Sequence, residues 1–202
     1  MLGPRTLRHM ETSPAVVDSR WTQTSLRPMR AAAFVKYAAH SAAAFAEDNV
    51  TSGRWPAFGA LERAQRDFAD SLPQGLATAD NFLFEIVVAK TVTPGLDIAD
   101  TLEVSAPSTR EITVGILWFA VVEKLGIKQA FVYDLEIDPG FRRQGYARFA
   151  FQALEDLVAA RDITQIGLHV FAHNVAAQAL YRSLGYDVTS HNLLKHLGPT
   201  AS

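Results

Sequence analysis

The feature that most constrains the fold of this chain is a glycine-containing turn between an apolar strand and an amphipathic helix. Residues 130–137 alternate as a strand, and residues 145–161 carry apolar side chains at helical spacing. The connecting segment 138–147 reads Asp-Pro-Gly-Phe-Arg-Arg-Gln-Gly-Tyr-Ala. A strand that enters a helix through such a short turn predicts a sheet with a helix packed on its face.

The rest of the chain predicts further strands and helices for the same sheet. Strands are expected over 21–29, 81–88, 112–122, 165–171 and 186–194, and helices over 30–46, from Pro56 to Leu72, and from Asn174 to Gly185. The segment 90–110, rich in Thr, Ser, Pro and Asp, is expected to be a long hairpin connection or an insertion. This order of elements predicts an α/β fold with a mixed sheet covered by helices.

Length and composition bound the class of protein. The 202 residues suit one domain, expected over 21–197, with residues 1–20 as a flexible N-terminal extension. A net charge of -2 argues against nucleic acid as a partner, and no apolar run is long enough for a membrane span or a signal peptide. The chain has no cysteine, which excludes disulfides and cysteinyl acyl intermediates, and its six histidines are scattered, so no metal site is expected. A cytoplasmic location is the expectation.

The turn itself has the character of an anion site. Gly145 and Ala147 are small residues in the first helical turn, where backbone N–H groups and the positive end of the helix dipole suit a phosphate. Arg142, Arg143 and Arg148 add positive charge there. The segment is neither a P-loop nor a dinucleotide-binding fingerprint. Taken alone, the segment is better interpreted as a structural turn with solvated arginines.

Two spaced segments resemble the GNAT superfamily of acetyltransferases. Residues 135–147 are similar to its acetyl-CoA signature, Arg/Gln-x-x-Gly-x-Gly/Ala after an apolar strand, with Ala147 where many members have a second glycine. Residues 174–186 resemble its Asn-x-x-Ala-x-x-Leu-Tyr-x-x-x-Gly-Phe/Tyr block, and residues 114–119 resemble its preceding strand. The specific motifs cover roughly residues 112–196.

The resemblance implies a mostly antiparallel sheet with one splayed parallel strand pair, 130–137 and 165–171, and an N-acetyltransferase activity. The partners would be acetyl-CoA and an amine-bearing acceptor, with the pantetheine arm between the splayed strands. Homodimerisation is plausible by the same resemblance. The implied cofactor contacts fall on Leu135, Ile137, Arg142, Arg143, Gln144, Gly145, Tyr146, Ala147, Arg148, Asn174, Ala177 and Tyr181.

The resemblance also implies catalytic roles. Tyr181 matches the position that protonates the leaving thiolate, although its helical stripe suits a core residue equally well. Asp134 and Glu136 flank Leu135 on one face of the strand and are the candidate bases, with His169 and His173 as alternatives. Asn174 is expected to cap a helix and to contact the cofactor. Two rival interpretations remain at this point: a non-catalytic acyl-CoA-binding module on the same fold, and an interaction protein without a cofactor.

Overall fold

A five-stranded sheet in the order β1-β2-β3-β4-β5 forms the centre of the protein. The structure is a computed structural model that describes residues 24–92, 108–124, 126–193 and 195. Its strands are β1 (Thr24–Pro28), β2 (Asn81–Val92), β3 (Ser108–Lys124), β4 (Ile127–Ile137) and β5 (Ile166–Leu168). Neighbouring strands are antiparallel except β4 and β5, which are parallel. The predicted mostly antiparallel sheet with one parallel pair is confirmed.

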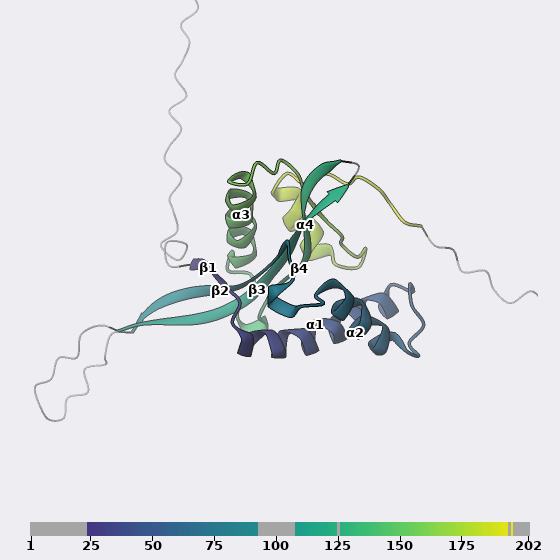
Figure 1. Cartoon of the computed structure of the whole chain (residues 1–202), viewed down its shortest axis with the longest axis horizontal. Coiled ribbons are helices and arrows are strands. Elements are labelled where there is room, and N and C mark those ends of the chain that lie inside the picture. Colours follow the sequence, from purple (N-terminus) through teal and green to yellow (C-terminus); the bar gives the residue numbers. More distant parts are fainter. Residues whose placement is uncertain (1–23, 93–107, 125, 194, 196–202) are drawn as a thin grey trace, which may run out of the picture.

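Within the described residues, α-helices cover both faces of this sheet (Figure 1). They are α1 (Ala31–Thr51), α2 (Ala60–Ser71), α3 (Tyr146–Ala159) and α4 (Val175–Ser183), with short 3₁₀ turns η1 (Gly75–Ala77) and η2 (Pro139–Phe141). Figure 1 shows α1 and α2 on one face and α3 and α4 on the other. The second helix begins at Ala60 and not at the predicted Pro56, because the preceding Gly59 adopts a left-handed conformation (φ 74°) that a helix cannot include.

The α3 face of the sheet contains the most completely buried side chains. Phe151 and Leu154 of α3 are fully buried against Leu117, Phe119 and the β4 strand. Burial of each such side chain contributes about 1.5–3 kcal/mol, so this layer fixes α3 on the sheet. Since β4 runs directly into α3 through η2, the same packing fixes the turn between them.

The α1 and α2 face is built around aromatic rings. Phe68 of α2 lies edge-on to Trp118 of β3 at 5.6 Å and to Tyr37 of α1 at 5.8 Å. Edge-to-face contacts of this kind add to the free energy gained from burial. They hold α1 across β3 and β4, so that the side chains of α1 reach the surface of β4.

A buried carboxylate ties the start of α1 to the sheet. Glu85 of β2, 1% exposed, accepts hydrogen bonds from the guanidinium groups of Arg27 and Arg30 and from the Thr113 hydroxyl. It also accepts from the backbone N–H of Arg30, the N-cap residue of α1, at 3.1 Å. Burial alone would raise the pKa of Glu85, but these hydrogen bonds lower it to about 2. A carboxylate at this helix N-terminus also complements the helix dipole.

Three other expected elements differ from the structure. The strand predicted over 186–194 is wrong for 186–193, which belong to no strand, because Val188 and Leu193 are exposed and so no apolar face supports pairing. The strand predicted over 165–171 is limited to Ile166–Leu168. Part of the predicted 90–110 connection is strand, since β2 and β3 pair as far as Val92 and Ser108. Residues 93–107, the extension 1–20 and both ends of the expected 21–197 domain lie outside the described residues, and these boundaries remain predictions.

Candidate active site

The turn between β4 and α3 exposes the beginning of a helix to a ligand. Arg143 and Gly145 both have positive φ angles, 62° and 89°, and Gly145 is the N-cap of α3. A glycine adopts this conformation without a steric cost. The first N–H groups of a helix have no intrahelical acceptor, so those from Tyr146 onward can bind an anion. The side chains of Tyr146 and Ala147 instead pack in a core cluster, which leaves their backbone as the part available to a ligand.

The parallel strands β4 and β5 pair over a short stretch only. The pairs are Ala130 with Ile166, Phe131 with Gly167, and Val132 with Leu168, where β5 ends. The Asp138 N–H donates to the Val114 carbonyl of β3. The N–H and C=O groups of successive residues point to opposite sides of a strand, so those of Leu135 and Ile137 point away from β3. They face the edge of β4 beyond its last pair with β5, at Val132, and we call this edge the opening.

The arginines of the turn have distinct neighbours. Arg142 turns back to β4, where its Nε donates to the Ile137 carbonyl at 2.8 Å and its guanidinium lies 3.7 Å from Glu136. Arg148 donates to the Ser183 hydroxyl of α4 at 2.7 Å. The Gln144 amide makes only a long contact, 3.4 Å, to the Gly140 carbonyl. The guanidinium of Arg142 thus faces the strand in this structure, not the start of α3.

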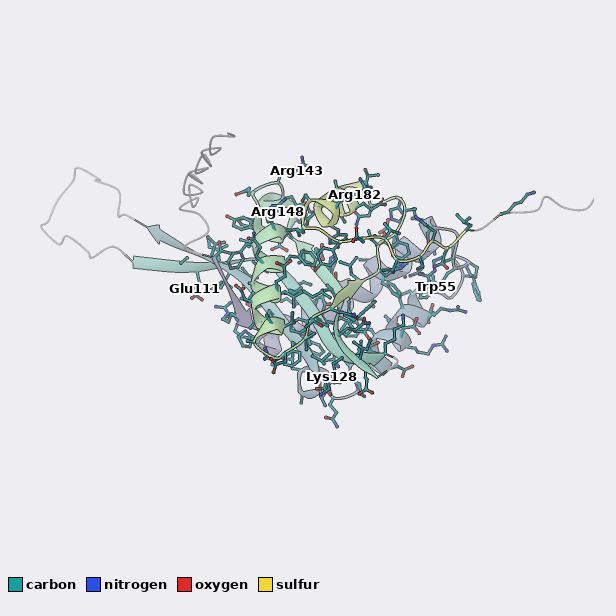
Figure 2. All side chains as sticks on the ribbon, turned by 90° about the horizontal axis from the view of Figure 1, so that it is seen from above. Trp55, Glu111, Lys128, Arg143, Arg148 and Arg182 are labelled. Atoms are coloured by element: carbon teal, nitrogen blue, oxygen red, sulfur yellow. The ribbon has the colours of Figure 1, made fainter. Side chains whose placement is uncertain are left out.

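Arg143, Arg148 and Arg182 gather at the end of the molecule where α3 begins (Figure 2). Arg182 comes from the last turn of α4 and was not singled out in the sequence. Its Nη2 lies 3.3 Å from the Gln178 side chain of the same helix. The three cations lie beside the exposed helix start, so both the backbone and the side chains there favour a ligand with negative charge.

A β-bulge in β4 turns two carboxylates toward α1. The register between β3 and β4 shifts at Tyr133, with Phe119 opposite Val132 and Trp118 opposite Asp134. An extra residue in one strand changes the face to which the following side chains point. Before the bulge Ala130 and Val132 pack on the α3 face, and after it Leu135 and Ile137 do. Asp134 and Glu136 therefore lie on the α1 face, and the expectation that they lie opposite Leu135 is confirmed.

Three side chains of α1 bind these carboxylates. The Tyr37 hydroxyl donates to Oδ2 of Asp134 at 3.0 Å, and the Ser41 hydroxyl donates to the same oxygen at 3.1 Å. The His40 Nε2 lies 2.9 Å from Oε2 of Glu136. Sequence reasoning missed all three, since nothing local in α1 marks them as partners of β4. The β4 surface beside the opening is therefore a cluster of two carboxylates and their α1 partners.

Comparison with known proteins agrees with this geometry. Residues 108–186 match the model of the acetyltransferase (GNAT) family, a span that runs from β3 to the end of α4. This region is a GNAT acetyltransferase domain. The parallel strand pair, the glycine turn and the bulged strand all lie within it.

Similarity to individual proteins extends beyond the GNAT domain. The chain is 29% identical over 172 residues to the N-acetyltransferase YycN of Bacillus subtilis, covering 85% of this chain and 97% of that protein. It is 26% identical over 173 residues to YdgE of the same organism, covering 86% of this chain and 98% of that protein. The crystal structure of YycN superimposes with a TM-score of 0.70 over 86% of this chain and 98% of that one. The likeness therefore includes α1 and α2 as well as the cofactor motifs.

A shorter stretch of the chain is similar to acetyltransferases whose acceptor is named. The ribosomal protein bS18-alanine N-acetyltransferase of Haemophilus ducreyi is 38% identical over 72 residues, which is 36% of this chain and 49% of that protein. A GCN5-related N-acetyltransferase from Ralstonia eutropha, 20% identical, shares the fold with a TM-score of 0.57 over 86% of this chain and 98% of that one. The GNAT family that residues 108–186 match binds acetyl-CoA.

Helix α4 of the GNAT domain carries Asn174 and Tyr181. The Asn174 side chain accepts from the Ala177 N–H at 3.1 Å, so the predicted N-cap is confirmed. Tyr181 packs partly into the core, edge-on to Phe151 at 5.3 Å. Burial raises the pKa of Tyr181, and the nearby carboxylate of Asp134 raises it further. The phenol therefore remains protonated at neutral pH.

The carboxyl group of Asp134 is affected by opposing influences. Burial raises the pKa of Asp134, and the hydrogen bonds from Tyr37 and Ser41 oppose that rise. The charge of Glu136 also raises it. The net effect is a pKa above the ordinary aspartate value, which makes this carboxylate a better proton acceptor near neutral pH.

The two histidines named as alternative bases have other surroundings. His169 lies edge-on to Phe171 at 5.1 Å, and burial lowers its pKa. His173 is paired with Asp48 of α1 through Nε2 and Oδ1 at 2.9 Å. The structure therefore places Asp134 near enough to Tyr181 for an electrostatic interaction, places Glu136 beside His40 and Arg142, and gives both histidines separate partners. Among the residues that the structure describes, no helix is long and apolar enough to cross a membrane.

Proposed function

We propose that this protein transfers an acetyl group from acetyl-CoA to a primary amine, by direct attack within a ternary complex. One observation carries the proposal: β4 continues to Ile137 beyond its last pair with β5, at Val132, and the turn that follows leads into the exposed N–H groups at the start of α3. An anion site next to a strand edge without a neighbouring strand suits a ligand with a pyrophosphate at one end and an amide-bearing arm at the other.

The residues of the turn fit the phosphate end of this ligand. The backbone from Gly145 to Arg148 would hold the pyrophosphate, with Arg143 and Arg182 as charge partners. Gln144 and the Asn174–Ala177 turn would border the same end. Arg148 would contact a phosphate by exchanging its bond to Ser183.

The backbone of Leu135 and Ile137 would pair with the pantetheine amides. The Ile137 carbonyl already accepts from Arg142 with one of its two lone pairs, and the arriving arm would compete with Arg142 for this oxygen and displace it. Displacement of Arg142 would free its guanidinium to contact the pyrophosphate. The resemblance to the GNAT family implies this contact for Arg142. Leu135 would contact the arm without this exchange.

Acetyl-CoA supplies the activated acetyl thioester, and the residues of β4 and α4 handle the protons. A carboxylate of β4, Asp134 or Glu136, would accept a proton from the acceptor ammonium. Tyr181 would donate a hydrogen bond or a proton to the leaving sulfur. Its raised pKa keeps the phenol protonated but makes complete transfer to a thiolate, ordinarily near pKa ~8.5, less favourable than for a free tyrosine.

The charge of the side chains beside the opening indicates the class of acceptor, whereas the acceptors of the named relatives do not. The bS18-alanine acetyltransferases match about a third of this chain, so their acceptor does not carry over to it. The carboxylates of Asp134 and Glu136 beside the opening favour a cationic amine. A cytoplasmic location and a homodimer remain predictions.

A thiol-release assay tests the proposal. Purified protein is mixed with acetyl-CoA and a panel of polyamines, aminoglycosides, amino acids and peptide N-termini, and free coenzyme A is measured. At least one amine should raise thiol release above the rate without acceptor, with an acetylated product of matching mass. Binding of acetyl-CoA without acetylation or hydrolysis would favour a non-catalytic binding module. Absence of both binding and release would favour an interaction protein.

A further inference from the structure

The carboxylate of Asp134 is anchored from outside the strand that carries it. The hydroxyls of Tyr37 and Ser41 both donate to Oδ2, at 3.0 and 3.1 Å. These residues are four apart on α1, so they project from the same side of that helix. Neither donor engages Oδ1, the second oxygen. Two hydroxyls on one oxygen fix the orientation of the carboxylate and leave the other oxygen for a further partner.

The position of Asp134 along β4 places this oriented carboxylate at the opening of the strand pair. The last β4–β5 pair joins Val132 to Leu168, and Asp134 follows two residues later. The bulge at Tyr133 directs its side chain to the α1 face. Tyr181, across the opening on α4, is close enough for the charge of Asp134 to raise the pKa of its phenol.

We infer that Asp134 is the general base of the transfer and that Tyr37 and Ser41 of α1 are its positioning residues. This inference rests on the proposed acetyltransferase function. Asp134 takes a proton from the acceptor ammonium, and the freed lone pair forms the C–N bond to the acetyl carbon. The C–S bond breaks with its electron pair on sulfur, and Tyr181 supplies a proton to that sulfur. The attacking nitrogen loses its second proton as the amide forms, and that proton returns to the tyrosine through solvent. Asp134 releases its own proton to solvent before the next turnover.

Glu136 is less suited to this role, because both of its carboxylate oxygens already have side-chain partners. Its Oε2 lies 2.9 Å from His40, and its Oε1 lies 3.7 Å from Arg142. Its side chain is 30% exposed and lies four residues beyond the last strand pair. Both oxygens of Glu136 therefore already have a partner, whereas Oδ1 of Asp134 receives neither of the α1 hydroxyls.

The charged and titratable groups that face Asp134 set the expected pH dependence. They are Tyr37 and His40 on α1, Glu136 on β4 and Tyr181 on α4. Of these, the Tyr37 hydrogen bond lowers the pKa of Asp134. Removal of that hydroxyl raises this pKa, so the acidic limb of the kcat/KM profile moves to higher pH. A tyrosine with a purely structural role would leave this limb where it is.

The test compares Tyr37→Phe and Ser41→Ala with the control Tyr133→Phe. Tyr133 is stacked on Trp118 at 4.6 Å and is 46% exposed. Its phenol group is not among the donors to Asp134. With the best acceptor of the amine panel, Tyr37→Phe should lower kcat by roughly ten- to a hundredfold, a part of the 10²–10⁴ that a general base contributes. It should also shift the acidic limb upward, while acetyl-CoA affinity and thermal stability stay close to wild type and Tyr133→Phe retains wild-type kinetics.

Two further variants assign the base. Asp134→Asn should lower kcat by at least about a hundredfold with acetyl-CoA affinity retained, and Glu136→Gln should have a smaller effect. The inference is overturned if Tyr37→Phe keeps both the wild-type kcat and the wild-type acidic limb, or if Glu136→Gln is the more damaging change. Absence of amine-dependent thiol release in the wild-type protein would overturn the proposed function and this inference together.

Discussion

The anchoring of α1 by Glu85 leads to a prediction about stability and pH. In the folded protein the pKa of Glu85 is about 2, against an ordinary value of 4.5. A difference of this size corresponds to about 3 kcal/mol, because one pKa unit is equivalent to ~1.36 kcal/mol. Solvent screens part of it, since Arg30 is 63% exposed, and we expect roughly 2 kcal/mol.

The direction of the pH dependence follows from the lowered pKa of Glu85. A carboxyl group with a lower pKa in the folded state stabilises the protein above its unfolded pKa, here pH 4.5. That contribution is lost progressively as the pH falls from 4.5 toward about 2. Glu85→Gln lacks this titration. The stability gap between wild type and Glu85→Gln should therefore be largest near neutral pH and should shrink by roughly 2 kcal/mol by about pH 2.

Urea unfolding followed by tryptophan fluorescence measures this gap at several pH values, since Trp118 is buried beside α2. Taking the difference between the two proteins cancels the titration of all other carboxyl groups. Glu111→Gln is the matched control, because Glu111 also pairs with Arg27 but is 54% exposed and should contribute less than ~1 kcal/mol. A gap that stays constant from pH 7 to pH 2 would refute the assigned role of Glu85.

Three further predictions concern the site and its support. Gly145→Glu should abolish acetyl-CoA binding in calorimetry, because it places bulk and negative charge at the start of α3. The control Gly126→Glu, at a similar positive φ (77°) in an open turn, should bind acetyl-CoA normally. Tight binding by Gly145→Glu would contradict the anion site. Tyr181→Phe keeps the ring contact with Phe151 and should lower kcat without lowering the melting temperature, and unchanged turnover with an identified acceptor would remove Tyr181 from the mechanism. Phe151→Ala should cost about 3–5 kcal/mol in chemical denaturation, and a loss below ~1 kcal/mol would show that this core layer is misassigned.

Local patterns in the sequence were sufficient to predict the turn, the helix start and the helix cap in the region from β4 to α4. The turn 138–147, the start of α3 and the Asn174 cap each depend on residues within one helical turn. The parallel strand pair was expected from the resemblance to the GNAT family, and the pairing of β4 with β5 confirms it. The extent of β5 was not predictable in this way, because pairing depends on the neighbouring strand and not on the apolar alternation of 165–171 alone.

The α1 side of the sheet depends on contacts between distant residues, which local patterns do not encode. Tyr37 and Ser41 lie 97 and 93 residues before Asp134, within an alanine-rich amphipathic helix. The bulge at Tyr133 interrupts a strand whose alternation looks regular in the sequence. Asp134 and Glu136 could be placed on one face from their spacing, but which helix covers that face required the packing of α1 on the sheet. The partners of both carboxylates therefore became visible only in three dimensions.

Calorimetric titration with acetyl-CoA at moderate salt tests the central claim most directly. The claim is that the start of α3 and the opening beside β4 form the site for this cofactor. The account predicts one site per chain with saturable heat, and loss of that heat in Gly145→Glu but not in Gly126→Glu. Absence of binding by the folded wild-type protein at high micromolar acetyl-CoA would contradict it.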